Sequence, residues 1–104
     1  GIMEKYTLKT GKEVSIKELP IDTIDNIKDM QNIVFENGKP VSVQGTHKTR
    51  TAWIRAGLGK LGNVAFNGEG VPDDIIKRLS EDEKDELAFL VQKAQELTEK
   101  KPIS

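Results

Sequence analysis

The strongest constraint on the fold is the C-terminal segment, which has the pattern of one long amphipathic helix. Ser80-Glu81-Asp82-Glu83 is a capping box, in which the serine hydroxyl and the glutamate carboxylate satisfy free backbone N–H groups. Lys100 and Lys101 complement the helix dipole at the other end, and Pro102 cannot continue the helix. We predict a helix from about Glu81 to Glu99. Its apolar stripe consists of Leu87, Leu90, Val91, Ala94 and Leu97.

The N-terminal segment 5–17 alternates apolar and polar residues with the period of a β-strand. Tyr6 and Leu8 fall on one face. Val14 and Ile16 repeat the pattern after a turn that contains Gly11. We predict a β-hairpin. Two strands alone are only marginally stable in water, so the apolar face of this hairpin must rest on another part of the chain.

Two further elements are predicted between residues 21 and 43. Asp22 can cap a short helix of about Thr23 to Gln31, in which apolar residues recur at helical spacing. Asn37-Gly38 separates residues 33–35 from residues 41–43, which is a strong short-hairpin signal. The same glycine could instead follow the end of a helix. We favour the hairpin because β-branched residues dominate both arms.

Another helix is predicted from Thr46, which can act as its cap, to about Leu58. Trp53 and Ile54 lie on or beside its apolar face. Three glycines between residues 57 and 62 weaken the end of this helix, so we expect it to fray or stop there.

Residues 63–70 read as a loop, and Val71-Pro72-Asp73-Asp74 has the composition of a helix start. Together these elements predict a single small α+β domain over residues 3–104, with an N-terminal hairpin and a helix-rich second half. Gly1 and Ile2 precede Met3 and are expected to be residues left by an expression vector.

The length of 104 residues fits one small domain. The chain has no cysteine, which excludes disulfides and thiolate metal sites and is compatible with a reducing cytosol. No apolar run approaches the ~20 residues needed to span a bilayer, and the N-terminus lacks the apolar core of a signal peptide. We expect a cytoplasmic protein that does not bind a membrane.

Charge is distributed unevenly along the chain, although the formal net charge is −1. Residues 1–36 carry 5 Lys or Arg and 7 Asp or Glu; residues 37–68 carry 5 and none; residues 69–104 carry 6 and 10. Two interpretations are open. The basic middle can bind a partner, or it can pack beside the acidic C-terminal part of its own chain.

None of the catalytic or metal-binding patterns in the chain has a suitable context. Gly57-Leu58-Gly59-Lys60-Leu61-Gly62 matches the dinucleotide pattern G-x-G-x-x-G, but these glycines follow a predicted helix rather than a strand. His47 is the only histidine and has no cysteine with which to bind a metal. The carboxylates of residues 80–86 lack the spacing of a calcium loop. We expect no cofactor, no metal and no enzymatic activity.

The basic segment 46–62 is a candidate nucleic-acid surface. Its bases could neutralise phosphates, and Trp53 or His47 could stack on a base. Against this, the net charge of the chain is slightly negative, whereas nucleic-acid-binding domains are usually strongly basic. Trp53 also falls beside the apolar face of its helix. The bases in and near the segment are Lys39, Lys48, Arg50, Arg55 and Lys60.

Phe89 lies on the opposite side of the predicted C-terminal helix from its apolar stripe, among Asp85, Lys93 and Glu96. Three interpretations are open for this aromatic residue. It can be a single exposed apolar side chain, a residue covered by the N-terminal hairpin, or an anchor for a partner or a second copy of the chain.

The opening segment TLKTGKEVSIKELPID resembles the start of small tailed-phage proteins, including tail assembly chaperones. The charged amphipathic C-terminal helix fits that type too. The resemblance implies a protein that binds other proteins during assembly and has no enzymatic activity. No functional residue is carried over from it.

We therefore expect a non-enzymatic protein-interaction module of the phage assembly or accessory type. The alternative is a nucleic-acid-binding protein that uses segment 46–62. Another protein is the expected partner, and association of two copies is also open. The candidate partner-binding residues are Lys48, Arg50, Arg55, Lys60 and Phe89.

Overall fold

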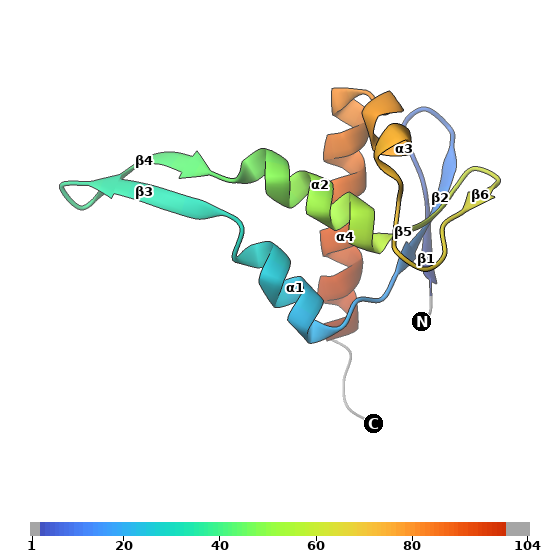
Figure 1. Cartoon of the computed structure of the whole chain (residues 1–104), viewed down its shortest axis with the longest axis horizontal. Helices are drawn as coiled ribbons and strands as arrows, with labels where there is room; N and C mark the ends of the chain where they lie inside the picture. Colours follow the sequence, from blue (N-terminus) through green and yellow to red (C-terminus); the bar gives the residue numbers. More distant parts are fainter. Residues whose placement is uncertain (1–2, 100–104) are drawn as a thin grey trace.

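The predicted N-terminal hairpin is present and forms half of a four-stranded antiparallel sheet (Figure 1). The structure is a computed structural model and describes residues 3–99, so Gly1 and Ile2 lie outside the described residues. Strands β1 (Met3–Thr7) and β2 (Glu13–Lys17) pair with each other. Strand β5 (Leu58–Leu61) pairs with β2, and β6 (Val64–Ala65) pairs with β5, which gives the order β1-β2-β5-β6.

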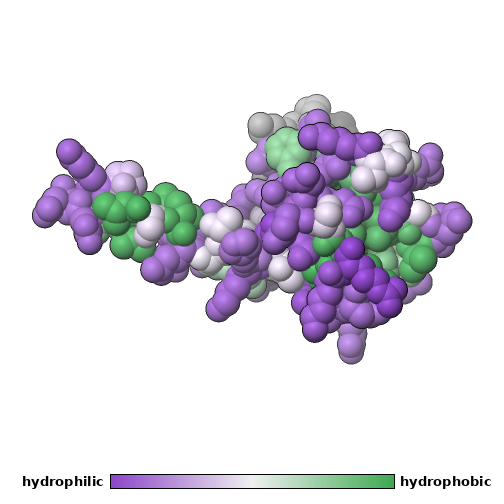
Figure 2. Space-filling model, turned by 90° about the horizontal axis from the view of Figure 1, so that it is seen from above, coloured by the Kyte–Doolittle hydropathy of each residue, from purple (hydrophilic) through white to green (hydrophobic). Residues whose placement is uncertain are grey.

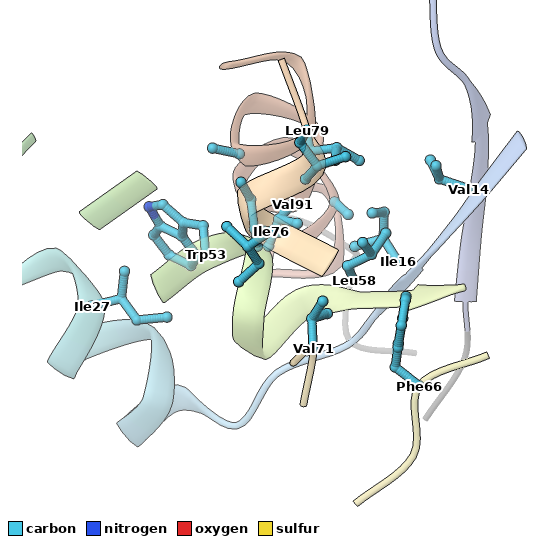
Figure 3. Packing of buried hydrophobic residues seen from close by; sticks show 14 of the residues in the cluster. Val14, Ile16, Ile27, Trp53, Leu58, Phe66, Val71, Ile76, Leu79 and Val91 are labelled. Atoms are coloured by element: carbon cyan, nitrogen blue, oxygen red, sulfur yellow. The ribbon is translucent and has the colours of Figure 1, made fainter. Parts of the chain in front are cut away.

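Within residues 3–99, four helices pack with this sheet around one hydrophobic core. They are α1 (Ile21–Lys28), α2 (Thr46–Gly57), α3 (Asp73–Arg78) and α4 (Glu81–Glu99). Figure 3 shows side chains from the sheet and from the helices meeting in the core. Residues with 0% exposure illustrate how the elements join: Ile16 from β2, Ile54 from α2, Leu58 from β5, and Leu87 and Val91 from α4.

Helix α4 has the predicted bounds, and the capping box forms as the sequence indicates. The Glu83 N–H donates to Ser80 Oγ at 3.1 Å, and the Ser80 N–H donates to Glu83 Oε1 at 3.0 Å. Leu87, Val91 and Ala94 of the predicted stripe are buried, whereas the side chain of Leu97 lies outside the described part of the chain. The α+β fold class is confirmed.

The second predicted hairpin is also present, but it stands apart from the main sheet. Strands β3 (Asn32–Glu36) and β4 (Lys39–Gln44) form a separate two-stranded sheet between α1 and α2, and it projects away from the helices (Figure 1). Asn37 and Gly38 have φ values of 51° and 78°, as a two-residue hairpin turn of the favoured hand requires. We call residues 32–44 the arm.

The prediction for residues 58–65 was wrong. We expected a fraying helix end followed by a loop, but these residues form strands β5 and β6 of the main sheet. Gly57 is a glycine because α2 lies directly against α4 there, and a Cβ atom would collide with the Val91 side chain. Gly62 serves the turn between β5 and β6, with a φ of 59°.

The predicted starts of α1 and α2 were also wrong. Helix α1 begins at Ile21 and ends at Lys28, with Pro20 rather than Asp22 at the N-cap. The fixed backbone of Pro20 supplies the extended conformation that precedes a helix, and Asp22 complements the dipole in the first turn.

Helix α2 has Gly45 rather than Thr46 at its N-cap. Gly45 has a φ of 83°, and an added Cβ atom would overlap the Met30 carbonyl oxygen. The chain therefore needs glycine where the end of the arm passes the end of α1. The helix start predicted at residues 71–74 is confirmed, since α3 begins at Asp73 after Pro72.

Candidate functional site

The arm exposes a group of large apolar side chains. Ile33, Phe35, Val41 and Val43 are 56%, 59%, 52% and 51% exposed. Every residue of β3 and β4 is exposed except Val34, which is half-buried. Figure 2 shows these apolar side chains gathered on the arm, away from the body of the protein. Large apolar groups that stay in contact with water are a typical mark of an interaction surface.

The strand register gives the arm two different faces. Ile33 lies opposite Val43, and Phe35 follows two residues after Ile33, so these three side chains share one face. The register shifts between Val34 and Phe35 and leaves Val41 as the extra residue of a β-bulge. We call Ile33, Phe35, Val41 and Val43 the apolar arm face.

The opposite face of the arm carries polar side chains together with the half-buried Val34. Val34 lies opposite Ser42, and Asn32 lies opposite Gln44. The two charged residues of the arm, Glu36 and Lys39, are cross-strand neighbours at the tip. The arm therefore carries no net charge.

A shallow groove lies where the arm joins α2. Met30, which is 42% exposed, contributes the largest apolar side chain to it. Gly45 joins the arm to the first turn of α2, where its carbonyl accepts hydrogen bonds from both the N–H and the hydroxyl of Thr49, at 2.9 and 2.8 Å. The groove is lined by Met30, His47, Lys48, Thr51, Ala52 and Arg55.

Arg50, one of the predicted partner-binding residues, has a largely buried side chain that joins α2 to α4. Its Nη2 lies 2.7 Å from Glu81 Oε2, and its Nη1 donates to Asp85 Oδ1 at 2.9 Å. The hydrogen bond to Asp85 is the largest cause of a raised pKa for Arg50; burial opposes it, and Glu81 adds to it. Because its side chain is only 14% exposed, Arg50 holds two helices together rather than presenting charge to a partner.

Arg55 is also engaged within the chain. Its Nη1 lies 2.7 Å from Asp73 Oδ1 and donates to the Val71 carbonyl at 3.2 Å. The Val71 N–H in turn donates to the Arg55 carbonyl at 3.2 Å, so this arginine fixes the start of α3 against α2. Two bases of the acid-free segment therefore pair with the acidic C-terminal part, as one of the two interpretations of the charge pattern expected.

The remaining candidates do not lie together. Lys48 is exposed at the groove beside the arm. Lys60 is exposed on β5, where it lies opposite Ser15 on the side of the sheet that faces away from the core. Phe89 is 61% exposed, which rules out the interpretation that the N-terminal hairpin buries it. It lies in a groove with Leu90 on α4 and Lys9 on the β1–β2 turn.

The glycine pattern at residues 57–62 has the order helix then strand, the reverse of a dinucleotide-binding unit. Across residues 3–99, no three His, Cys, Asp or Glu side chains gather in a way that could hold a metal ion. None of the helices in this range is both long and apolar enough to cross a membrane. Comparison of the chain with protein-family models, with curated proteins and with solved structures finds no match.

The apolar arm face was missed as a candidate site, although its hairpin was predicted. A signal was present in the sequence. Several apolar residues lie on one hairpin, and the segments before and after this hairpin are both predicted helices. No neighbouring strand along the chain is therefore available to cover these apolar residues.

Proposed function

We propose that this protein is a non-enzymatic interaction module that binds a protein partner through the apolar arm face. The observation that carries the proposal is the half-exposed state of four large apolar side chains on a hairpin that extends beyond the body of the protein. Their exposure is unfavourable in water, and covering them would release that cost. The hairpin also leaves two strand edges that another chain could pair with.

The chemistry of the arm favours a protein over a nucleic acid. Binding to phosphates needs clustered bases, but the arm has one base and one acid. Of the bases in segment 46–62, Arg50 and Arg55 already pair with carboxylates of the same chain. A partner with an apolar surface is therefore the better match.

The role in phage-type assembly is a narrower hypothesis within this proposal. It rests on the resemblance of residues 7–22 to small tailed-phage proteins. An exposed apolar arm is compatible with a protein that is completed by other subunits, since partner surfaces of that kind are more apolar than ordinary surfaces.

The test is capture of partners from native lysate on immobilised protein, with and without nuclease, comparing wild type, Phe35→Ser and Phe89→Ser. The two phenylalanines are 59% and 61% exposed, so the comparison tests which of these two candidate anchors binds the partner. We expect a protein that survives nuclease treatment and is retained by wild type and Phe89→Ser, but lost from Phe35→Ser. Retention by Phe35→Ser equal to wild type would contradict the proposal, and loss of all bound material with nuclease would favour the nucleic-acid alternative.

A further inference from the structure

We propose that the occupant of the apolar arm face is the same face of a second copy of this chain, so that two arms pack face to face about a two-fold axis. This inference rests on the proposed function, because it names the partner of the same site. It is carried by the charge, the geometry and the size of the arm.

The charge of the arm fits a second copy. Ile33, Phe35, Val41 and Val43 bring no charged group to the apolar face, and the charged pair Glu36 and Lys39 belongs to the polar face by the strand register. Two such faces can meet without burying a charge, whose desolvation would oppose association. Since the arm has no net charge, two copies do not repel each other.

The geometry of the arm supports an antiparallel arrangement. Two sheet faces pack roughly 10 Å apart with interdigitating side chains. The arm projects from one end of the molecule (Figure 1), so antiparallel arms place the two bodies at opposite ends, where they do not collide. A two-fold axis across the middle of the arm then brings Ile33 of one copy over Phe35 of the other, and Val41 over Val43.

The same arrangement brings the tip of each arm toward the base of the other. The turn at Asn37 and Gly38 approaches Met30 of the second copy, whose exposed side chain lies in the groove beside α2. The arm and the groove are thereby covered together. Each protomer then contributes the same two surfaces, its apolar arm face and its groove, to the interface, as a two-fold contact requires.

The size of the arm sets the strength of the contact. Strands of five and six residues are roughly 17–20 Å long, so the arm face is smaller than the ~800 Å² per partner of a standard stable interface. The added contact of the tip with the groove brings it closer to that value. We therefore expect a dimer that dissociates on dilution.

The first measurement is the molar mass of the purified chain by light scattering over a range of concentrations. We expect the mass of wild type to rise toward twice the monomer value and the mass of Phe35→Ser to stay at the monomer value. Ile21→Ser, which changes an apolar residue of α1 that is 62% exposed and has no place in the apolar arm face, is the control and should behave as wild type. A monomer mass for wild type up to about 1 mM, where only contacts weaker than ~4 kcal/mol would escape detection, would overturn the inference.

The second measurement uses the absence of cysteine from the chain. Val43→Cys places a single thiol on the apolar face, and Ser42→Cys places one on the polar face of the same strand. With a short thiol–thiol cross-linker, we expect cross-linked dimer from Val43→Cys and not from Ser42→Cys. Equal cross-linking of the two variants would overturn face-to-face packing.

The two proposals fail in different ways. If the purified chain is a monomer but capture from lysate still depends on Phe35, the second-copy inference falls and the protein-binding arm stands. If neither the molar mass nor the capture depends on Phe35, both proposals fall.

Discussion

Gly57 on α2 lies so close to Val91 on α4 that no Cβ atom fits between the two helices. This contact lets α2 and α4 approach each other just before the chain passes into β5. Glycine at this position is a packing requirement rather than a helix terminator.

We predict that Gly57→Ala destabilises the protein by about 1–3 kcal/mol, the usual effect of overpacking a core. Denaturant unfolding measures the change. Val91→Ala removes the colliding atoms, so the double variant should lose less stability than the sum of the two single variants. Additive losses of stability would show that the Val91 side chain is not what excludes a Cβ atom at position 57.

Gln95 is buried on α4 and binds the chain where β2 leads into α1. Its Oε1 accepts from the Leu19 N–H at 2.8 Å, and its Nε2 donates to the Lys17 carbonyl at 2.8 Å. Gln95→Leu would leave both backbone groups without these bonds, and each such group costs about 1–3 kcal/mol.

We expect the Leu19 amide of Gln95→Leu to exchange its hydrogen faster than in wild type, together with the loss of stability. Gln92→Leu is the control, because Gln92 is exposed and its Nε2 donates only to Ala88 one turn away. Its effect should stay within about 0.5 kcal/mol. Equal effects of the two variants would contradict the role of Gln95.

Arg50 and Lys48 differ in role although both are bases of the same helix. Arg50→Ala removes two interhelical ion pairs and a largely buried side chain, so we expect a loss of about 1–2 kcal/mol, limited because the two carboxylate side chains are 69% exposed. Lys48→Ala should change the free energy of unfolding by less than about 0.5 kcal/mol. Added salt should weaken the Arg50 ion pairs in wild type, and the difference in the free energy of unfolding between wild type and Arg50→Ala should therefore become smaller. A small effect of Arg50→Ala would show that the acidic C-terminal part does not need this arginine.

Tyr6 is the single tyrosine, so its titration can be followed directly by the ultraviolet absorbance of phenolate. Burial, and secondarily the charge of Glu4, raises the pKa of Tyr6 above its ordinary value of 10.0. Because the pKa of Tyr6 is raised in the folded protein, the contribution of Tyr6 to the free energy of unfolding is fully present below pH 10. This contribution is lost as the pH rises through the folded pKa. Glu4→Gln should lower the pKa partway toward 10.0. A titration midpoint at or below 10.0 in the folded protein would contradict this environment.

The elements that the sequence specified well are those with local signals. The capping box at Ser80 and Glu83 predicted the start of α4, and Asn37-Gly38 predicted the arm hairpin, because each signal lies within a few residues. The stop signal of Lys100, Lys101 and Pro102 lies outside the described residues. Strand β5 was missed because its pairing partner, β2, lies more than forty residues earlier. A glycine-rich segment has little strand character of its own, so only tertiary pairing makes it a strand.

The candidate site was only partly predictable for a similar reason. The bases could be counted from the sequence, but the distinction between Arg50, which is paired, and Lys48, which is exposed, depends on carboxylates from a distant helix. The apolar residues of the arm were recognised as strand residues. Their exposure depends on where the two flanking helices pack, and strand periodicity does not predict the packing of those helices.

Binding through the apolar arm face requires that this face be available to a partner rather than buried by its own chain. The most direct test is the free energy of unfolding of Phe35→Ser in dilute solution, compared with Phe66→Ser. Phe66 is 6% exposed in the core, and Phe35 is 59% exposed on the arm. We expect Phe35→Ser to cost about 1 kcal/mol or less, the range of a cross-strand contact, and Phe66→Ser to cost about 3–5 kcal/mol. A loss of about 3 kcal/mol or more for Phe35→Ser would show that the arm face belongs to the core of its own chain and would contradict partner binding through this face.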